Sequence, residues 1–210
     1  MNSFKNNKGK IIVESLIKTI QQNKDYLSKI DGEIGDGDHG INMNKGFTLC
    51  EERIADKDLN LTDSLKELAM VLMMEIGGSM GPLYGTMFFE MSISTEGKED
   101  IDSQVFAEML SKAVAGIQSL GEAKVGDKTM IDTLIPAVEA FQNENSNFST
   151  AIDKMIEAAE KGKDSTIDLV AKIGRASRLG ERSRGVLDAG ATSCFLLLQA
   201  MGETIKELLE

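Results

Sequence analysis

Apolar residues recur at helical spacing along most of the chain. In the segment 10–30, Ile12, Leu16 and Ile20 lie four residues apart, which places them on one face of a helix. No segment shows the alternation of apolar and polar residues typical of a half-buried strand, and proline, which breaks helices, occurs only twice. The segments with helical spacing are 10–30, 41–57, 61–76, 81–94, 103–119, 131–144, 148–161, 164–178 and 188–210. The sequence therefore predicts an all-α fold of about eight amphipathic helices.

Two of the predicted helices have residues suited to cap their first turn. Thr62 is an N-cap candidate for the segment 61–76, and Asp164 or Ser165 is one for 164–178. A side-chain oxygen at this position accepts a hydrogen bond from a free N–H group of the first turn. The final segment begins apolar on nearly every side, which is typical of a fully buried helix.

A chain of 210 residues can bury one substantial core, so we expect a single domain spanning 1–210. The sequence shows no internal repeat and no linker. Glycine is frequent, with 20 residues, and gathers in short stretches that are expected to be turns between helices. The stretches are 32–40, 77–85, 121–126 and 185–190. Loops on a rigid scaffold commonly carry functional residues, so these turns are candidate sites.

The chain has 34 acidic and 23 basic residues, a formal net charge of −11. Such a surface repels nucleic acids and anionic membranes, so neither is expected as a partner. No N-terminal signal segment is recognisable, and the apolar run CFLLLQAMG is too short to cross a bilayer. Cys50 and Cys194 lack motif spacing and are expected to be buried thiols of a reducing compartment. We therefore expect a soluble, cytoplasmic protein.

The stretch DGEIGDGDHGIN, residues 31–42, contains four carboxylates and neither lysine nor arginine. A helix or a strand would not bring Asp31, Asp36 and Asp38 together, whereas an irregular loop with four glycines can. Two carboxylates about 4 Å apart repel by about 4 kcal/mol at an effective dielectric constant near 20. A hard divalent cation such as Mg²⁺ or Ca²⁺ removes this repulsion. The stretch indicates a metal site, and a solvated acidic turn before the next helix stays open as the alternative.

A calcium-binding EF-hand does not fit this stretch. A loop starting at Asp31 has Asn42 at its twelfth position, and one starting at Asp36 has Phe47, where the motif requires glutamate. His39 is the only histidine of the chain, and three interpretations are open for it: a polar contact residue, a phosphorylated carrier or a zinc ligand. Zinc is disfavoured because no other histidine or cysteine lies nearby.

Two further glycine-rich stretches are candidates for contacts with phosphate. Residues 77–86 place glycines and Ser79 before a helix, whose first N–H groups bind phosphate well, although a tight turn explains them equally. Residues 121–129 are not a Walker loop, because Asp127 precedes Lys128 and no strand leads into the stretch. A loop that contacts a nucleotide in another way stays open there.

Four arginines cluster in GRASRLGERSRG, residues 174–185. Arg175, Arg178 and Arg182 share one face if a helix persists through them, and arginine suits bidentate contacts with phosphate. A solvated surface stripe is the alternative. Taken together with the acidic stretch, the glycine-rich turns and the arginines indicate a metal–nucleotide or metal–phosphate site, since phosphoryl transfer depends mainly on positioning and charge neutralisation.

Five motifs in one order resemble the nucleotide-binding L subunits of dihydroxyacetone kinases, over essentially the whole chain. The motifs are GEIGDGDHGINMNKGF, GGSMGPLYGT, GDKTMIDTLIPA, GRASRLGERS and LDAGATS. The resemblance implies an up-and-down, barrel-like bundle of eight amphipathic helices. It further implies that ADP or ATP and two Mg²⁺ ions bind in the loops at one rim.

Carried over by position, the resemblance makes Asp31, Asp36 and Asp38 the magnesium ligands. The nucleotide-binding positions that it implies are His39, Gly40, Ile41, Asn42, Gly78, Ser79, Met80, Gly121, Met130, Arg175, Asp188, Ala189 and Gly190. Met80 follows Ser79 where the family often has Ala-Ser, which displaces the hydroxyl by one residue, and Ala189 replaces a proline that is common in the family. No catalytic side chain is implied, since the nucleotide itself carries the phosphoryl group.

In length the chain resembles the type of L subunit that is a separate protein and is not fused to a substrate-binding domain. In that type ADP stays bound and is phosphorylated by a phosphohistidine protein, an M-type subunit of the sugar phosphotransferase system. The phosphoryl group then passes to dihydroxyacetone on a separate K subunit. Two alternatives are a nucleotide subunit of a kinase for another ketose or a fatty acid, and a nucleotide-loaded regulatory binding subunit.

Overall fold

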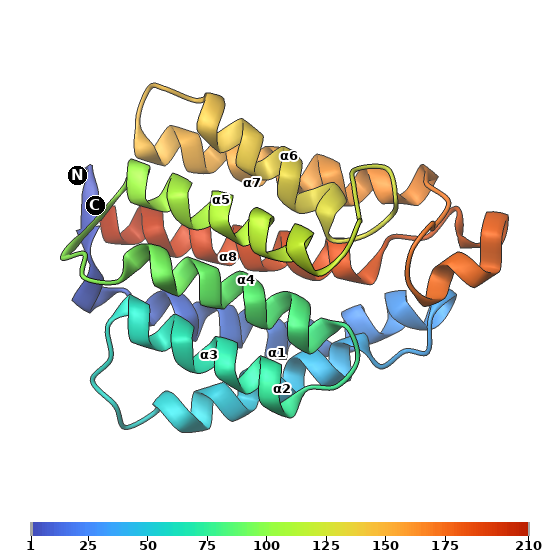
Figure 1. Cartoon of the computed structure of the whole chain (residues 1–210), viewed down its shortest axis with the longest axis horizontal. Helices are drawn as coiled ribbons and strands as arrows, with labels where there is room; N and C mark the ends of the chain where they lie inside the picture. The colour runs from blue at the N-terminus through green and yellow to red at the C-terminus, as the bar shows by residue number, and fades with distance from the viewer. Residues whose placement is uncertain (1, 210) are drawn as a thin grey trace.

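The computed structural model of the protein describes residues 2–209 and contains eight α-helices within them (Figure 1). The helices are α1 (Lys10–Ile34), α2 (His39–Ile54), α3 (Leu61–Glu75), α4 (Met80–Thr95), α5 (Ser103–Leu120), α6 (Ile131–Asn143), α7 (Phe148–Ser165) and α8 (Ala189–Leu209). The shorter elements are β1 (Ser3–Lys5), η1 (Asn6–Lys8), β2 (Asp100–Asp102), η2 (Thr166–Asp168) and η3 (Arg175–Ser183). The prediction of an all-α fold with about eight helices is confirmed.

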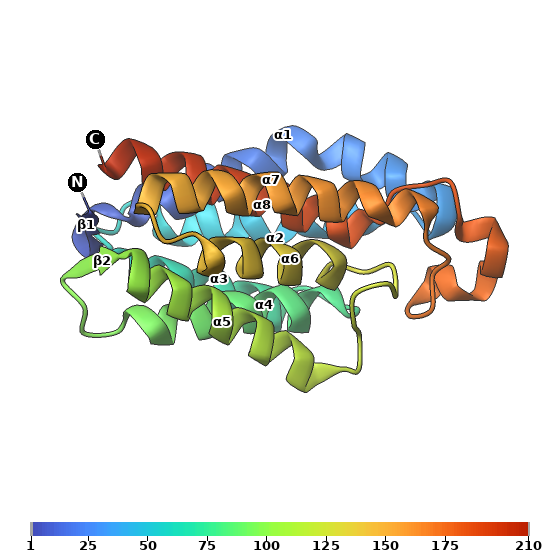
Figure 2. The same cartoon turned by 90° about the horizontal axis from the view of Figure 1, so that it is seen from above.

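The helices form a closed ring. Each α-helix packs against the next one in the chain, and α8 packs against α1. All of them run lengthwise through the molecule, as Figures 1 and 2 show from two directions. The predicted apolar face of α1 lies inside the ring, where Ile12, Leu16 and Ile20 are each at most 1% exposed. The ring buries one face of most helices, which is what the amphipathic spacing predicts. The first turns of α8 are buried on every side, as predicted, since residues 191–195 are all buried. No helix among residues 2–209 is long and apolar enough to cross a membrane.

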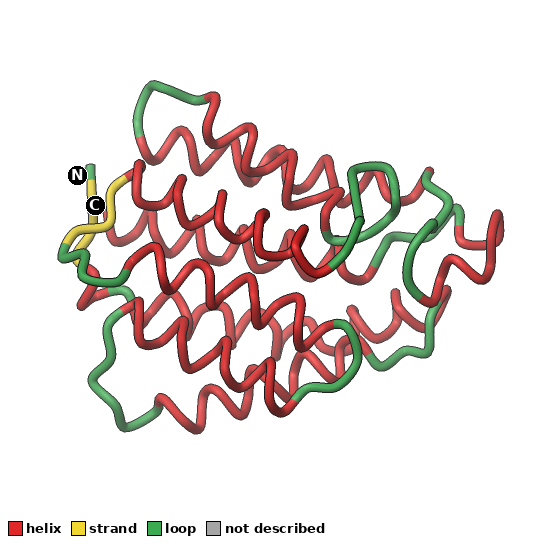
Figure 3. Tube along the Cα trace, in the orientation of Figure 1, coloured by secondary structure: helices red, strands yellow, loops and turns green. Residues whose placement is uncertain are grey.

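An up-and-down ring places alternate connections at the same end. The connections after α1, α3, α5 and α7 therefore share one end, at the right of Figure 3, while both termini lie at the other end. Each of these four connections contains part of one of the glycine-rich stretches that the sequence analysis identified as turns. Four candidate loops that are far apart in sequence thus meet at one end of the molecule.

The opposite end is closed by a small strand pair and a buried polar network. β1 pairs antiparallel with β2, and these strands of three residues each are too short to show a period of two in the sequence. Asn6 donates to the Thr62 hydroxyl at 3.0 Å and to two main-chain oxygens. The prediction that Thr62 caps α3 is wrong. The N-cap is Asn60, whose side chain accepts a hydrogen bond from the Asp63 N–H at 2.8 Å, and the Thr62 hydroxyl instead accepts from the Asn6 side chain.

The predicted helix 164–178 is also wrong. The α7 helix extends through Ser165, and the chain then forms η2, an irregular segment and the 3-10 turns of η3. Gly174 and Gly180 have φ angles of +75° and +56°, which interrupt helical geometry. The break at Gly180 also separates Arg182 from the first turns of η3, so the three arginines predicted on one face do not share a continuous helix.

Candidate functional site

A cavity of about 560 Å³ opens at the glycine-rich end of the ring. All four connections contribute to its wall, together with the first residues of α2, α4 and α8. Its volume lies in the range of small-molecule and cofactor sites. Acidic side chains are concentrated on the side formed by the α1–α2 connection, and the glycines of the α3–α4 connection form another part of the wall.

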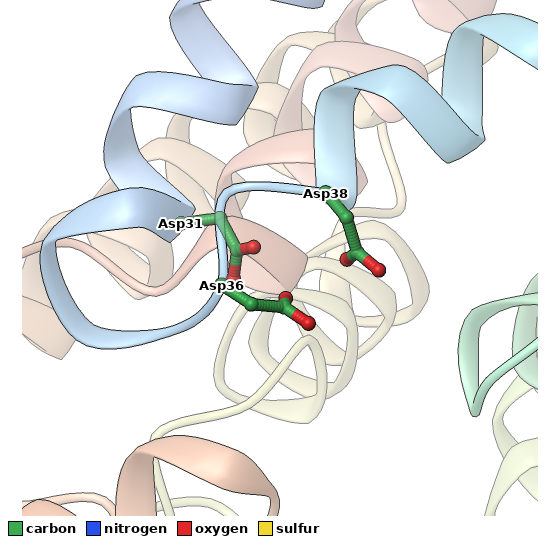
Figure 4. A group of neighbouring side chains, drawn as sticks. All are labelled: Asp31, Asp36 and Asp38. Carbon is green, nitrogen blue, oxygen red and sulfur yellow. The ribbon is translucent and has the colours of Figure 1, made fainter.

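Three carboxylates meet at the edge of this cavity. One oxygen from each of Asp31, Asp36 and Asp38 can be chosen so that all lie within 4.8 Å of one another. Asp31 belongs to the last turn of α1, whereas Asp36 and Asp38 lie in the loop before α2, and their carboxylates are directed toward one common region (Figure 4). The predicted irregular loop therefore supplies two of the three side chains, and a helix end supplies the third.

Backbone conformation in the α1–α2 connection makes this meeting possible. Gly35 ends α1 with its N–H bonded to the Asp31 carbonyl at 2.5 Å. Gly37 has a φ angle of +76°, which favours glycine, and it turns the chain back toward α1. The His39 N–H lies 3.4 Å from Asp31 Oδ2, so the start of α2 approaches the same carboxylate.

The donor set suits a hard divalent cation. Carboxylate oxygens are the ligands that magnesium and calcium prefer, and three of them close together repel unless a cation is present. In the structure Arg175 supplies positive charge there: its guanidinium is paired with Asp36 and lies 3.8 Å from Asp38. All three of these side chains are about half exposed, so the ion pairs lie open to solvent and are weak. The cluster thus fits a metal ion, with Arg175 beside it.

Gly40 determines how closely α2 can approach α1. A Cβ atom at this position would collide with the Lys24 carbonyl oxygen and would lie 2.7 Å from the Ser28 nitrogen. We expect Gly40→Ala to lower the free energy of unfolding by about 2 kcal/mol, because overpacking forces helices apart. Urea denaturation measures this loss. Gly121→Ala is the matched control, since nothing lies within 4 Å of a Cβ there; equal stability of both variants would contradict the prediction.

His39 enters a hydrogen-bonded chain that leads into the core. Its Nε2 lies 2.8 Å from the Ser193 hydroxyl, which lies 2.6 Å from the Tyr84 hydroxyl. Tyr84 donates to the Gly190 carbonyl at 3.1 Å. Burial lowers the pKa of His39 to about 4, although the charge of Asp31 opposes this shift, so the imidazole is neutral at pH 7.

Asp188 caps α8 at the cavity wall. Its Oδ2 accepts from the Ala191 N–H at 2.8 Å, and its own N–H donates to the Thr166 hydroxyl at 3.0 Å. Burial raises the pKa of this carboxyl to about 6, even though the Ala191 N–H and Lys128 favour the charged form.

The shifts of His39 and Asp188 act on stability in opposite directions. Between its unfolded pKa of 6.5 and its folded value of about 4, His39 takes up a proton in the unfolded state first, so stability falls as pH falls. Between about 6 and 3.8, Asp188 takes up a proton in the folded state first, so stability rises as pH falls. In the metal-free protein the two contributions largely cancel.

His39→Gln is expected to remove one side of this balance. On acidification from pH 7 to 4, the metal-free variant should gain about 2 kcal/mol of unfolding free energy relative to the metal-free wild type. Denaturant titrations at a series of pH values measure the difference. Asp188→Asn should show the opposite change, and parallel pH profiles for all three proteins would contradict the assignment.

Lys128 lines the cavity and is 1% exposed. Its ammonium donates to the carbonyl oxygens of Thr166 at 2.6 Å, Leu169 at 3.2 Å and Val186 at 2.6 Å. These bonds use its three donors and draw the segment after α7 toward the α5–α6 connection. Burial lowers the pKa of Lys128, and the nearby charge of Asp188 opposes that effect.

The α5–α6 connection is itself held by two carboxylates. Asp132, which is 1% exposed, accepts from the Gly126 N–H at 2.6 Å and from the Thr129 N–H at 2.7 Å. Asp127 accepts from the Lys124 N–H at 3.0 Å, and this bond lowers the pKa of its carboxyl. These three bonds hold the connection in the conformation that places Thr129 and Met130 at the cavity.

The sequence that forms this site matches a known family of protein domains. The profile of the DAK2 domain matches residues 33–203. This chain belongs to the DAK2-domain family. The match begins two residues after Asp31 and includes the connections that form the cavity wall.

Curated relatives of this DAK2 domain extend over nearly the same length. The chain is 36% identical over 202 residues to the "PEP-dependent dihydroxyacetone kinase 2, ADP-binding subunit DhaL" of Listeria innocua, with 93% of each chain covered. It is 39% identical over 189 residues to the "PEP-dependent dihydroxyacetone kinase, ADP-binding subunit DhaL" of Escherichia coli K12, with 87% of this chain and 89% of the relative covered.

Solved structures share the fold of this DAK2 domain. The dihydroxyacetone kinase of C. freundii in its native form matches with a TM-score of 0.72 and 24% identity, over 97% of this chain and 36% of that chain. The same enzyme in complex with AMP-PNP and Mg²⁺ matches with a TM-score of 0.69 and 22% identity, over 93% and 33%. The DAK2 domain thus spans about a third of those chains, and at this identity the likeness shows the fold.

Most residues predicted for the site lie together in this DAK2 domain. Those that line the cavity are Asp31, Asp36, Asp38, His39, Asn42, Gly78, Ser79, Met80, Met130, Arg175, Asp188, Ala189 and Gly190. Three others do not line it. Gly40 is buried against α1, the Ile41 side chain is 54% exposed, and Gly121 follows α5 in open space.

Sequence reasoning missed several residues of the DAK2 domain that shape the cavity. Tyr84 and Lys128 line it but were assigned no role, and Ser193 contacts His39 from behind. Nothing in the residue types around Lys128 indicates burial, since lysine is among the residues least often buried. Tyr84 and Ser193 lie on predicted helices, and the sequence alone gives no reason to distinguish them from ordinary buried residues, because their hydrogen-bond partners are distant in the chain.

Proposed function

We propose that this DAK2 domain is the ADP-binding subunit of a dihydroxyacetone kinase and holds ADP or ATP with Mg²⁺ in the cavity. The observation that carries the proposal is the meeting of Asp31, Asp36 and Asp38 at the edge of a cavity of about 560 Å³. The names of relatives that match over nearly their whole length support the same assignment. The number of Mg²⁺ ions that we propose is two.

The three aspartates hold the ions on one side of the cavity, and bound Mg²⁺ neutralises phosphate oxygens. Across from them α4 begins at Met80, and Ser79 makes no side-chain cap, so the first N–H groups of α4 stay free to donate to phosphate. This contact uses the backbone and therefore tolerates the displaced hydroxyl of Ser79. Arg175 adds a second cation, which moves from the aspartates to a phosphate oxygen.

The remaining cavity wall receives the base and the ribose. Met130 and the turn Asp188–Gly190 form this part of the wall, and Met130 is 5% exposed. His39 and Asn42 lie at the start of α2, beside the aspartates. Gly40, Ile41 and Gly121 do not line the cavity. We therefore propose that these three residues contribute to nucleotide binding only indirectly, by positioning the residues beside them.

Bound ADP accepts a phosphoryl group from an M-type phosphohistidine protein of the phosphotransferase system and delivers it to dihydroxyacetone on a separate K subunit. This chain then needs no phosphorylated side chain of its own. The contacts of His39 are consistent with an imidazole that is not phosphorylated, because its Nε2 is hydrogen-bonded to the Ser193 hydroxyl. The compartment that we propose is the cytoplasm, and Cys50 and Cys194 are buried free thiols, as expected there.

Native mass spectrometry of the untagged protein tests the proposal. We expect the purified protein to retain ADP and Mg²⁺, and to release the nucleotide when a chelator removes the metal. After incubation with the phosphohistidine donor, the mass of the nucleotide should increase by one phosphoryl group while the chain itself gains none. A protein that neither retains ADP nor binds added Mg–ADP would contradict the proposed function, and a phosphorylated His39 would contradict the mechanism.

A further inference from the structure

Two arginines near the cavity have no partner. Arg178 and Arg182 lie in η3, both side chains are exposed, and neither makes a hydrogen bond or an ion pair within residues 2–209. The remaining arginines of that range, Arg53, Arg175 and Arg184, are each paired with a carboxylate. The chain has 34 acidic residues, yet these two guanidinium groups are left unpaired in one short segment. They are therefore available to a molecule outside the chain.

The geometry of η3 places Arg178 beside the cavity. In a 3-10 helix, side chains three residues apart lie on the same side. Arg175 lines the cavity at the start of η3, so Arg178 lies on the cavity side, one turn farther along. Arg182 follows the break at Gly180 in the same segment. This segment, drawn in orange, extends beyond the ends of the helices at the right of Figures 1 and 2, where a partner protein can reach it.

Exposed apolar side chains lie at the same end of the molecule. The four most exposed large apolar side chains among residues 2–209 are Met74, Ile41, Val125 and Leu120, with exposed fractions between 50% and 71%. They lie in the last turn of α3, the first turn of α2, the α5–α6 connection and the end of α5, all at the cavity end. A single exposed apolar residue is ordinary, whereas a group of them around a cavity is typical of a protein–protein contact, in which arginine and methionine are enriched.

Charge complementarity indicates which partner this end receives. A phosphohistidine that phosphorylates bound ADP has to enter the mouth of the cavity, and its phosphoryl group is an anion. The chain has a net charge of −11, so most of its surface repels such a group. Unpaired cations at the mouth offset this repulsion and favour the encounter. Dihydroxyacetone is uncharged, so the subunit that carries it does not bring such an anion to the mouth.

We propose that Arg178 and Arg182, together with the exposed apolar side chains at this end, form the docking surface for the phosphohistidine donor protein. This inference rests on the proposed function. In the transfer the P–N bond breaks, the ring nitrogen keeps the electron pair and takes up a proton, and a β-phosphate oxygen of ADP forms the new P–O bond. Arg178 and Arg182 stay outside the cavity and guide the donor to it, so they are not catalytic residues.

Rapid-quench kinetics with a ³²P-labelled donor protein test this surface. The measured quantity is the rate at which labelled ATP forms on the chain loaded with Mg–ADP. Replacing both arginines, Arg178→Gln with Arg182→Gln, should lower the second-order rate constant about 5-fold at low ionic strength, the range for two exposed charge pairs. At about 0.5 M salt the difference should nearly vanish, since exposed charges are then screened. The rate at saturating donor and the affinity for ADP should stay unchanged.

Two further variants separate local contacts from net charge. Met74→Gln should lower the same rate constant about 3-fold at low and at high salt, because it removes an apolar contact and no charge. The double variant Lys8→Gln with Lys18→Gln is the matched control. Lys8 and Lys18 are exposed and have no partner within residues 2–209, but they lie at the opposite end and in the middle of α1. This control should retain the wild-type rate constant.

The outcomes separate this inference from the proposed function. If the wild type is phosphorylated on its ADP and the arginine variant reacts equally fast, or if the lysine control slows as much, the docking surface is overturned and the proposed function stands. Transfer from bound ATP to dihydroxyacetone on the K subunit should be unchanged in the arginine variant, and equal slowing there would overturn the assignment to the donor. A wild-type dimer that the arginine variant dissociates would assign the surface to a second copy and overturn it likewise. A wild type that binds no ADP would count against the proposed function itself.

Discussion

Replacing Asp36 by alanine is expected to weaken Mg²⁺-dependent ADP binding about 100-fold or more. Asp36 is one of the three carboxylates that converge within 4.8 Å, and no other acidic group of residues 2–209 joins this cluster. At an effective dielectric constant near 20, a unit charge 4 Å away contributes about 4 kcal/mol, or roughly a thousandfold in affinity. A loss of about 100-fold is therefore the smallest that we expect. Isothermal titration with Mg–ADP measures it.

The same substitution should leave the metal-free fold intact. The Asp36 side chain is 48% exposed, and its removal relieves repulsion from Asp31 and Asp38. The free energy of unfolding without metal should thus stay within about 0.5 kcal/mol of the wild type. Asp36→Asn, which retains the shape of the side chain, should behave like Asp36→Ala. Glu33→Gln is the matched control, since Glu33 lies outside the cluster; loss of binding there, or retained binding in Asp36→Asn, would contradict the metal assignment.

Lys128→Met is expected to lower the free energy of unfolding by about 3 kcal/mol. The methionine fills a similar volume but cannot donate, which leaves the carbonyl oxygens of Thr166, Leu169 and Val186 without the ammonium. A buried acceptor that loses its partner costs about 1–3 kcal/mol, and the segment between α7 and α8 can relax to regain some of this. Urea denaturation midpoints provide the measurement.

Lys172→Met is the control for this substitution. Lys172 lies in the same segment, but its side chain is 60% exposed and its contact with Asp127 is 3.3 Å long. Asp127 is buried but retains the Lys124 N–H as a partner, and the ammonium of Lys172 is largely solvated, so this variant should lose only about 1 kcal/mol or less. Since Arg175 lies within the segment that Lys128 holds and Asp188 directly follows it, Lys128→Met should also weaken ADP binding. A Lys128→Met protein as stable as Lys172→Met would show that the buried ammonium does not organise the site.

Helix formation could be predicted well because its signal is local. The spacing of Ile12, Leu16 and Ile20 identifies the buried face of α1 without any knowledge of its partners. The exception is informative: residues 164–178 have helical spacing, yet the chain leaves the α-helix after Ser165. There the carbonyl oxygens of Thr166 and Leu169 bond to Lys128, which is distant in sequence. Tertiary hydrogen bonds and two glycines of positive φ override the local pattern.

The candidate site could be predicted in part for a similar reason. Asp31, Asp36 and Asp38 lie within eight residues, so their spacing and the glycines between them predict from the sequence alone that the three carboxylates bind one cation site. Gly40 and Ile41 lie in the same stretch but outside the cavity wall, because the orientation of each residue depends on how α2 packs against α1.

The sequence by itself determined that this chain forms about eight amphipathic helices, and its acidic stretch predicted a metal site, since both inferences depend on residues that are neighbours in the chain. Only the tertiary structure decided that α8 closes the ring on α1, that Lys128 is buried and that Ser193 reaches His39. His39 and Ser193 are 154 residues apart, and Tyr84 and Ser193 are 109 apart. Such contacts arise when packed helices bring distant residues together, and no local periodicity records which residues will meet.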